Sequence, residues 1–188
     1  MKRTTTGSCH AAARGASIGN AAYQIALVGN PNVGKSVVFN RLIGGTTTVS
    51  NYPGTTVEVF RGRFDTGTGI PMEVIDTPGM YTFSCITEEE GVTRRLLFQE
   101  RPDIVVHVIE AKALARSLPL TAQLVETGFD VIVAINMMDE LARAGLVIDT
   151  ERLADRIRLP VIPLTAIRGD GIAALVTRIE ERAHGLLN

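Results

Sequence analysis

Short apolar runs alternate with longer amphipathic segments along most of the chain. The runs hold almost only apolar residues, which is typical of strands buried on both faces of a parallel sheet. They lie at 24–29, 104–109, 131–135 and 161–164. The amphipathic segments carry apolar residues at helical spacing, which predicts helices. These helices are expected at 35–43, 88–99, 117–127, 137–158 with a break at Gly145, and 171–187.

A hairpin is predicted between the first two of these helices. Residues 57–64 alternate in polarity, and a glycine-rich turn at 66–69 leads into the apolar residues 72–75. Polar stretches at 44–56 and 76–87 are predicted to be loops. The alternation of strands and helices predicts an α/β fold with three layers. We expect a six-stranded, mostly parallel sheet to which the hairpin contributes one antiparallel edge strand.

The first strand and helix enclose a phosphate-binding pattern. Residues 29–36 read GNPNVGKS and match G-x-x-x-x-G-K-[ST]. Glycines at both ends let backbone N–H groups approach phosphate oxygens. In this pattern Lys35 reaches the β- and γ-phosphates, and the Ser36 hydroxyl is a ligand of Mg²⁺. The residues predicted here to bind nucleotide are Gly29, Asn30, Asn32, Val33, Gly34, Lys35, Ser36 and Val37.

Three further polar motifs follow predicted strands, at the edge where ligands of α/β sheets lie. Residues 76–79 read DTPG, in which Asp76 is placed to hold Mg²⁺ through water and the Gly79 amide to meet a γ-phosphate. Residues 136–139 read NMMD, and Thr165-Ala166 follows the last strand. Taken singly, DTPG is an ordinary aspartate turn, and Asn136 or Asp139 could merely cap a helix.

The NMMD motif indicates which base is bound. The Asp139 carboxylate can accept hydrogen bonds from the ring N–H and the exocyclic amine of guanine, a donor pair that adenine lacks. Asn136 and Met137 complete the base-binding side of the predicted site, and a backbone N–H at Thr165-Ala166 would meet the guanine carbonyl. The motif therefore predicts binding of GTP and GDP and rejection of ATP.

Composition narrows the class of protein. The 188 residues suffice for one domain, with 45% hydrophobic and 21% charged residues. We expect a disordered tail at 1–22 and a single domain at 23–188. A net charge of −1 argues against nucleic-acid binding by bulk charge. No apolar run reaches the length of a membrane span, and His107 is interpreted as a core histidine.

The order of these motifs resembles the translation-factor-like branch of P-loop GTPases. More specifically, the chain resembles the N-terminal G domain of the FeoB ferrous iron transporters over about residues 24–183. The residues that carry this resemblance are GNPNVGKS at 29–36, FN at 39–40, NYPGTTVE at 51–58, SLPLTAQL at 117–124 and NMMD at 136–139. In that family the domain precedes a helical and a membrane domain, so we expect an N-terminal fragment or an unusually short member. Val37 departs from the family, which usually has a hydroxyl residue there.

The resemblance implies a switch mechanism. Thr56, in a first switch loop with Gly54 and Thr55, is the expected second Mg²⁺ ligand, and Thr55 is the competing candidate. Met80 stands where Ras-like enzymes place a water-orienting glutamine, so hydrolysis is expected to be slow. Asn32 either ligates an activating K⁺, as in related GTPases, or only stabilises the loop turn. Lys35, Thr56, Gly79 and Asn32 are the expected catalytic residues.

Two functions remain open at this point. The first is a GTPase switch that, in the intact protein, regulates Fe²⁺ transport at the cytoplasmic face of the plasma membrane. Its partners would be GTP or GDP and the membrane domain of the same protein, without nucleic acid, and a homo-oligomer stays open. The alternative is an Era/EngA-like GTPase acting in ribosome assembly or RNA modification. Val57-Glu58, after the switch threonines, favours the first function.

Overall fold

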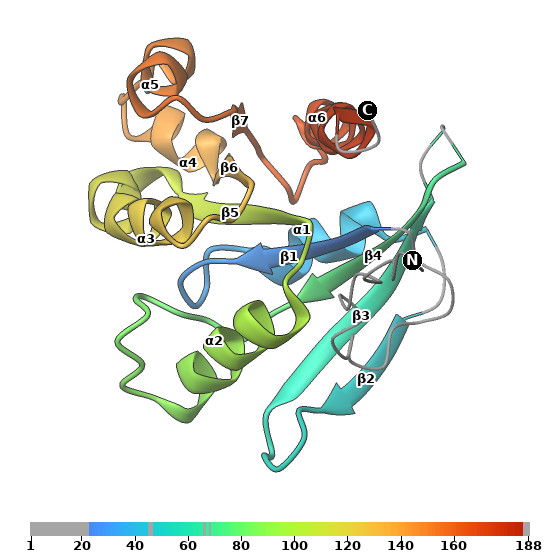
Figure 1. Cartoon of the computed structure of the whole chain (residues 1–188). Coiled ribbons are helices and arrows are strands. Elements are labelled where there is room, and N and C mark those ends of the chain that lie inside the picture. The colour runs from blue at the N-terminus through green and yellow to red at the C-terminus, as the bar shows by residue number, and fades with distance from the viewer. Residues whose placement is uncertain (1–22, 45–46, 66, 68, 186–188) are drawn as a thin grey trace, which may run out of the picture.

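The sheet has seven strands in the order β2-β3-β4-β1-β5-β6-β7 (Figure 1). The computed structural model describes residues 23–44, 47–65, 67 and 69–185, so the predicted tail 1–22 lies outside the described residues. The strands are β1 Tyr23–Val28, β2 Thr47–Asn51, β3 Glu58–Asp65, β4 Pro71–Asp76, β5 Ile104–Glu110, β6 Val131–Asn136 and β7 Val161–Pro163.

The pairing of the strands confirms the fold class and corrects the sheet. Strands β4, β1, β5, β6 and β7 are parallel, and β3 runs antiparallel to both of its neighbours. The predicted six strands are therefore seven, and the antiparallel strand β3 is interior because β2 forms the edge. Strand β2 lies inside the stretch predicted as a loop, and all five of its residues are exposed. A strand without a buried face carries no apolar alternation from which it could be predicted.

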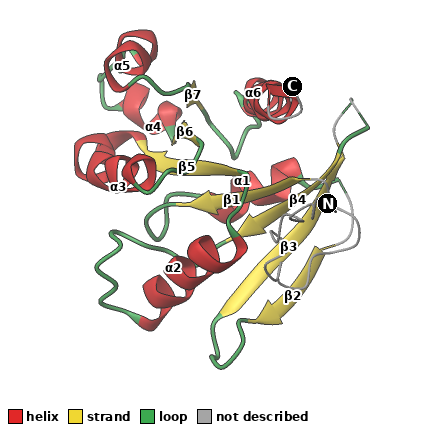
Figure 2. Cartoon of the chain, in the orientation of Figure 1, coloured by secondary structure: helices red, strands yellow, loops and turns green. Residues whose placement is uncertain are grey.

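The predicted helices are present with shifted ends (Figure 2). The predicted helix 117–127 begins three residues earlier, after a short 3₁₀ turn, and contains Pro119. The segment 137–158 is two helices, because Gly145 adopts a positive φ of 71° in the connection. The helices are α1 Lys35–Leu42, α2 Glu88–Glu100, α3 Leu114–Glu126, α4 Met138–Arg143, α5 Thr150–Ile157 and α6 Ile172–Gly185, with the 3₁₀ turn at Ala111–Ala113.

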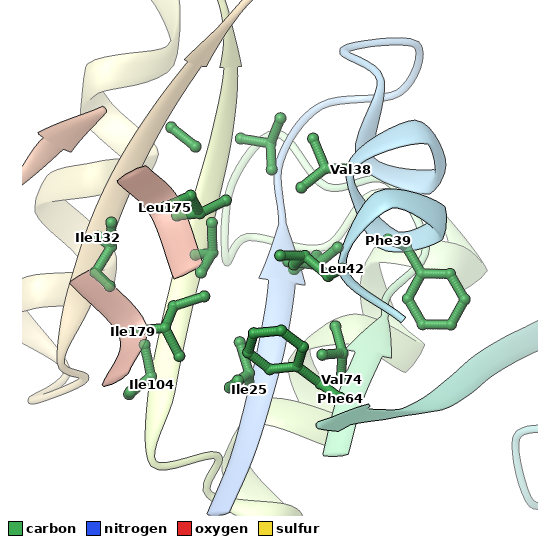
Figure 3. Packing of buried hydrophobic residues seen from close by; sticks show 14 of the residues in the cluster. Ile25, Val38, Phe39, Leu42, Phe64, Val74, Ile104, Ile132, Leu175 and Ile179 are labelled. Atoms are coloured by element: carbon green, nitrogen blue, oxygen red, sulfur yellow. The ribbon is translucent and has the colours of Figure 1, made fainter. Parts of the chain in front are cut away.

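Helices cover both faces of the sheet and form two main clusters of buried side chains. Figure 3 shows α1 and α6 contributing Leu42 and Ile179 to the cluster on one face, against Ile25 of β1. On the other face Leu120 and Leu124 of α3 pack against alternate residues of the central strands. This arrangement gives the three layers expected from the sequence.

His107 is a core residue, as the sequence indicated. Its side chain is fully buried in β5, and its Nδ1 atom lies 2.9 Å from the Thr121 hydroxyl on α3. Burial, followed by the charge of Lys35, lowers the pKa of His107 to about 3. The imidazole is therefore neutral in the folded protein at neutral pH.

The parallel strands bring the four polar motifs to one edge of the sheet. The phosphate loop follows β1, Asp76 ends β4, Asn136 ends β6, and Thr165 lies just beyond β7. Because these strands run in the same direction, their carboxyl ends share one rim. The fold thus assembles residues that are up to 136 positions apart, counting from Gly29 to Thr165.

Candidate nucleotide-binding site

Close contacts at two glycines fix the phosphate loop. A Cβ atom at Gly29 would lie 2.2 Å from the Val108 carbonyl oxygen. Gly34 has a φ of 88°, and a Cβ there would lie 2.4 Å from the Asn136 side-chain nitrogen. Only glycine fits either position, so the loop lies directly against β5 and the guanine motif.

Lys35 folds back over this loop. The residue is 8% exposed, and its ammonium donates a long hydrogen bond of 3.4 Å to the Asn30 carbonyl. Desolvation by burial lowers the pKa of Lys35, although the carboxylates of Asp76 and Glu89 act in the opposite direction. A buried ammonium that donates only one long hydrogen bond is suited to donate to a phosphate oxygen.

Ser36 and Asp76 together have the character of a magnesium site. The Ser36 hydroxyl donates a 2.6 Å hydrogen bond to Oδ2 of Asp76. The other carboxylate oxygen, Oδ1, is buried and accepts no hydrogen bond from the described part of the chain. Burial raises the pKa of Asp76, opposed by the Ser36 hydrogen bond and the charge of Lys35. A hydroxyl beside a carboxylate oxygen without a donor fits Mg²⁺, which prefers oxygen ligands.

The side chain of Asn30 points away from the phosphate position. It is 3% exposed, and its amide nitrogen lies 3.4 Å from the Ser117 hydroxyl of α3. Ser117 in turn donates to the Ala113 carbonyl one helical turn earlier. The Asn30 side chain is thus engaged with α3, and its carbonyl accepts from Lys35. Ser117 anchors the loop, a role that its position in the sequence did not indicate.

Asn136 connects the phosphate loop with the last motif. Its amide nitrogen donates to the Val33 carbonyl at 3.0 Å, and its amide oxygen accepts from the Ala166 N–H at 3.0 Å. The N–H expected to meet the guanine carbonyl was that of Thr165 or Ala166. In this structure both are engaged, the Ala166 N–H with Asn136 and the Thr165 N–H with the Asp170 carbonyl at 3.1 Å. The amide side chain holds three separate segments of the rim in register.

A cavity of about 190 Å³ opens beside Asn136. Asp139 borders it, with its Oδ2 atom 2.6 Å from Nη2 of Arg143. Desolvation acts to raise the pKa of Asp139, and the hydrogen bond and charge of Arg143 outweigh it, so the pKa lies below its usual value. The Asp139 carboxylate is therefore ionised at neutral pH, as acceptance from two guanine donors requires. The other residues of the sequence motifs that line this cavity are Gly34, Val37, Met137, Thr165 and Ala166.

The two switch threonines have different environments. The Thr55 hydroxyl donates to the Tyr52 carbonyl at 2.9 Å and accepts from the Val57 N–H at 3.3 Å, closing a turn around Gly54. Thr56 is exposed and lines a cavity of about 690 Å³ that also borders Pro78 and the start of α2. Thr56, rather than Thr55, therefore lines the cavity that borders Pro78 of the DTPG motif.

The residues after Asp76 pack tightly against the phosphate loop. A Cβ atom at Gly79 would lie 2.6 Å from the Pro31 ring, and the Met80 N–H donates to the Gly29 carbonyl at 3.0 Å. The Met80 side chain is fully buried in the core. Asn32 is exposed at the loop tip with a φ of 63°.

Glu90 organises the second switch loop, a role missing from the sequence interpretation. Its carboxylate accepts hydrogen bonds from the backbone N–H groups of Tyr81, Ile86 and Thr87. Thr87 and Glu90 form a capping box at the start of α2. The T-x-x-E spacing at 87–90 is the sequence signal that would have indicated it.

Two structural features are absent from the described residues. No helix among them is long and apolar enough to cross a membrane. No group of three or more His, Cys, Asp or Glu side chains lies together as a metal-binding cluster in the part of the chain described.

The chain matches known proteins over most of its length. A family model described as "Ferrous iron transport protein B" matches residues 23–179. An Fe(2+) transport protein A/Fe(2+) transporter FeoB fusion protein from Porphyromonas gingivalis is 40% identical over 81% of this chain and 18% of its own. The Fe(2+) transporter FeoB of Salmonella typhimurium is 38% identical over 83% of this chain and 21% of its own. The chain thus spans about a fifth of the length of these curated relatives.

Solved structures agree with this match. The cytosolic domain of L. pneumophila FeoB superposes with a TM-score of 0.80 at 38% identity, over 85% of this chain and 68% of that one. A mutant of S. thermophilus NFeoB bound to GDP superposes with a TM-score of 0.76 at 37% identity, over 82% of this chain and 60% of that one.

Proposed function

The chain belongs to the ferrous iron transport protein B family, and from this premise we propose that it is a GTP-hydrolysing switch domain. It binds GTP, hydrolyses it to GDP and phosphate, and in the intact protein regulates Fe²⁺ transport across the membrane. The GDP bound to a mutant of S. thermophilus NFeoB supports a guanine nucleotide as the ligand. The Fe(2+) transporter relatives support a role in Fe²⁺ transport. The family match favours this function over RNA-directed ribosome assembly.

One observation carries the guanine specificity. The Asn136 amide bridges Val33 of the phosphate loop and Ala166 of the last motif, which sets the base pocket at a fixed distance from the phosphates. The ionised Asp139 carboxylate borders that pocket. A nucleotide whose phosphates lie at Lys35 would thus present its base to Asp139.

The residues on the phosphate side supply positioning and charge. Lys35 neutralises oxygens of the β- and γ-phosphates, and backbone N–H groups from Gly34 and Gly79 donate to the transferring group. Ser36, Thr56 and Asp76 would hold Mg²⁺, which neutralises phosphate charge when bound. Because the side chain at Met80 is apolar and buried, no residue at that position orients the attacking water, and turnover is slow.

The two switch loops connect the nucleotide to the rest of the transporter. Segment 51–57 holds Thr56, and segment 77–87 follows Asp76. A γ-phosphate orders both loops and its loss releases them, as in other GTPases. In the intact protein this difference would reach the membrane domain, with the G domain at the cytoplasmic face of the membrane.

The experiment is a competition titration with GDP, GTP and ATP, in which GDP and GTP bind and ATP does not. Asp139→Asn should weaken GDP binding about 100-fold, since two hydrogen bonds to a charged acceptor are lost. The same variant should gain affinity for xanthosine diphosphate, because xanthine presents an acceptor where guanine has its amine. Asp155→Asn, the same change at an exposed residue of α5 outside this pocket, is the control and keeps the base preference. Equal affinities for ATP and GTP would contradict the proposal.

A further inference from the structure

Arg41 joins helix α1 to the turn at residues 165–170, which we call the base-recognition loop. Its Nε atom donates to the Ala166 carbonyl at 3.1 Å, and its Nη2 atom donates to the Ile167 carbonyl at 2.5 Å. The planar guanidinium thus binds two consecutive carbonyls from one side chain, a geometry that a lysine ammonium lacks. Arg41 lies on α1, 125 positions before Ala166.

Both backbone polar groups of Ala166 are engaged by side chains. Its N–H donates to the Asn136 amide, and its carbonyl accepts from Arg41. Asn136 also donates to Val33, and α1 begins at Lys35, directly after the phosphate loop. Two separate routes therefore tie the base-recognition loop to the phosphate loop, and Arg41 provides the outer one.

The loop itself is a closed turn with an open outer side. The Gly169 N–H donates to the Thr165 carbonyl at 3.0 Å, and Thr165 pairs with Asp170. Ile167 is 73% exposed, so solvent covers the outer side of the turn except where Arg41 reaches it. Movement of this turn away from the pocket requires that both Arg41 hydrogen bonds break.

We propose that Arg41 is a positioning residue for guanine recognition that slows the release of bound nucleotide. The inference rests on the proposed function, because it assigns Arg41 to the same base pocket. Arg41 touches the loop backbone and not the base, so its effect is on how long the pocket stays closed. Loss of Arg41 lets the Ala166–Ile167 segment open more often while Asn136 and Asp139 remain in place.

The test measures association and dissociation of a fluorescent GDP analogue by stopped flow. Arg41→Ala should release the analogue about fivefold faster with an unchanged association rate, since about 1 kcal/mol of net hydrogen bonding is lost. Arg41→Lys should behave almost as Arg41→Ala, because one ammonium cannot bridge both carbonyls. Arg178→Ala is the control, because Arg178 is an exposed arginine of α6 whose guanidinium pairs with the Glu181 carboxylate at 2.9 Å.

Hydrogen–deuterium exchange separates positioning from general damage. In Arg41→Ala with GDP bound, exchange should rise in 165–171 and stay at the parental level in 29–36. Release at the parental rate, or faster exchange throughout the chain, would overturn the inference. If the parent protein bound no guanine nucleotide, the proposed function itself would fail. GDP binding by the parent with unchanged release from Arg41→Ala would refute only the role of Arg41.

Discussion

Met80 and Asn32 are the two residues that bear on how hydrolysis is promoted at the phosphate site. The Met80 side chain is fully buried, and Asn32 is exposed at the tip of the phosphate loop. A loose phosphoryl-transfer transition state needs positive charge near the bridging oxygen, which an arginine finger supplies in other GTPases. An amide oxygen at Asn32 could hold a monovalent cation for the same purpose. Asn32 also has a positive φ of 63°, which asparagine adopts more readily than most residues. The turn alone therefore also explains an asparagine at this position.

Substitution of Asn32 by glycine separates these two roles. We expect faster GTP hydrolysis in K⁺ than in Na⁺ at equal ionic strength, measured as phosphate release with saturating Mg²⁺ and GTP. Asn32→Gly keeps the positive φ accessible and removes the amide oxygen, so it should abolish the difference while retaining GDP binding. Equal turnover of the parent in the two salts would leave Asn32 as a turn residue.

His107 makes stability depend on pH. Its pKa is lowered from 6.5 to about 3 in the folded protein, so between these values only the unfolded chain binds the proton. Its contribution to the free energy of unfolding is complete above pH 6.5 and falls by about 1.4 kcal/mol per pH unit below it. When the pH falls from 7 to 5, the free energy of unfolding of His107→Gln should therefore decrease by about 2 kcal/mol less than that of the parent, measured by urea unfolding. His184→Gln is the control, and an unchanged slope in His107→Gln would contradict the account.

The residue identities at the rim were predictable because each motif has a fixed spacing. Lys35, Ser36, Asp76, Asn136 and Asp139 all lie along the rim, as the sequence predicted. The partners of these motifs were not predictable. Ser117 and Arg41 contact segments 87 and 125 positions away. Arg41 belongs to no motif, and the SLPLTAQL motif that begins at Ser117 does not indicate the contact with Asn30.

Strand β2 shows where the prediction of elements from periodicity fails. The buried strands were predicted because consecutive apolar residues face helices on both sides of the sheet. Strand β2 is held only by its pairing with β3, and its residues TTVSN are exposed throughout. Backbone pairing leaves no trace in polarity, so this segment was interpreted as a loop.

Helix α2 depends on its first turn, and Glu90 is the residue to change. Glu90 is 3% exposed. Its carboxylate accepts hydrogen bonds from the backbone N–H groups of Tyr81, Ile86 and Thr87, which lie before the first residue of the helix. These hydrogen bonds, from Tyr81 first, lower the pKa of Glu90. Glu90→Ala should reduce the free energy of unfolding by about 1–2 kcal/mol, measured by urea denaturation.

Glu88→Ala provides the comparison for this change. Glu88 lies in the same first turn but is exposed, so its loss should cost only about 0.3–1 kcal/mol through the helix dipole. Losses of equal size in the two variants would show that the Glu90 hydrogen bonds do not stabilise the loop.

At the scale of the whole molecule, the two predicted switch loops lie on opposite sides of one cavity. Thr56 lines this cavity of about 690 Å³ from the β2–β3 side, and Pro78 and Thr87 line it from the side of α2. In the proposed mechanism, the groups on the two sides of this cavity meet around a γ-phosphate. Strands β2 and β4 run in the same direction, because β3 between them is antiparallel to both, so the loops that follow them lie at the same rim.

Closure of this cavity should depend on Thr56 and on the γ-phosphate. A hydroxyl that joins the metal shell only when GTP is bound stabilises the GTP complex and not the GDP complex. With saturating Mg²⁺, Thr56→Ala should therefore lower affinity for a non-hydrolysable GTP analogue about tenfold and leave GDP affinity unchanged. The analogue should protect amides 51–57 from hydrogen exchange in the parent and not in this variant. Thr55→Ala breaks a turn that exists without nucleotide, so it should change affinity for both nucleotides alike. A selective loss of GTP-analogue affinity in Thr55→Ala, with none in Thr56→Ala, would instead assign the metal-binding role to Thr55.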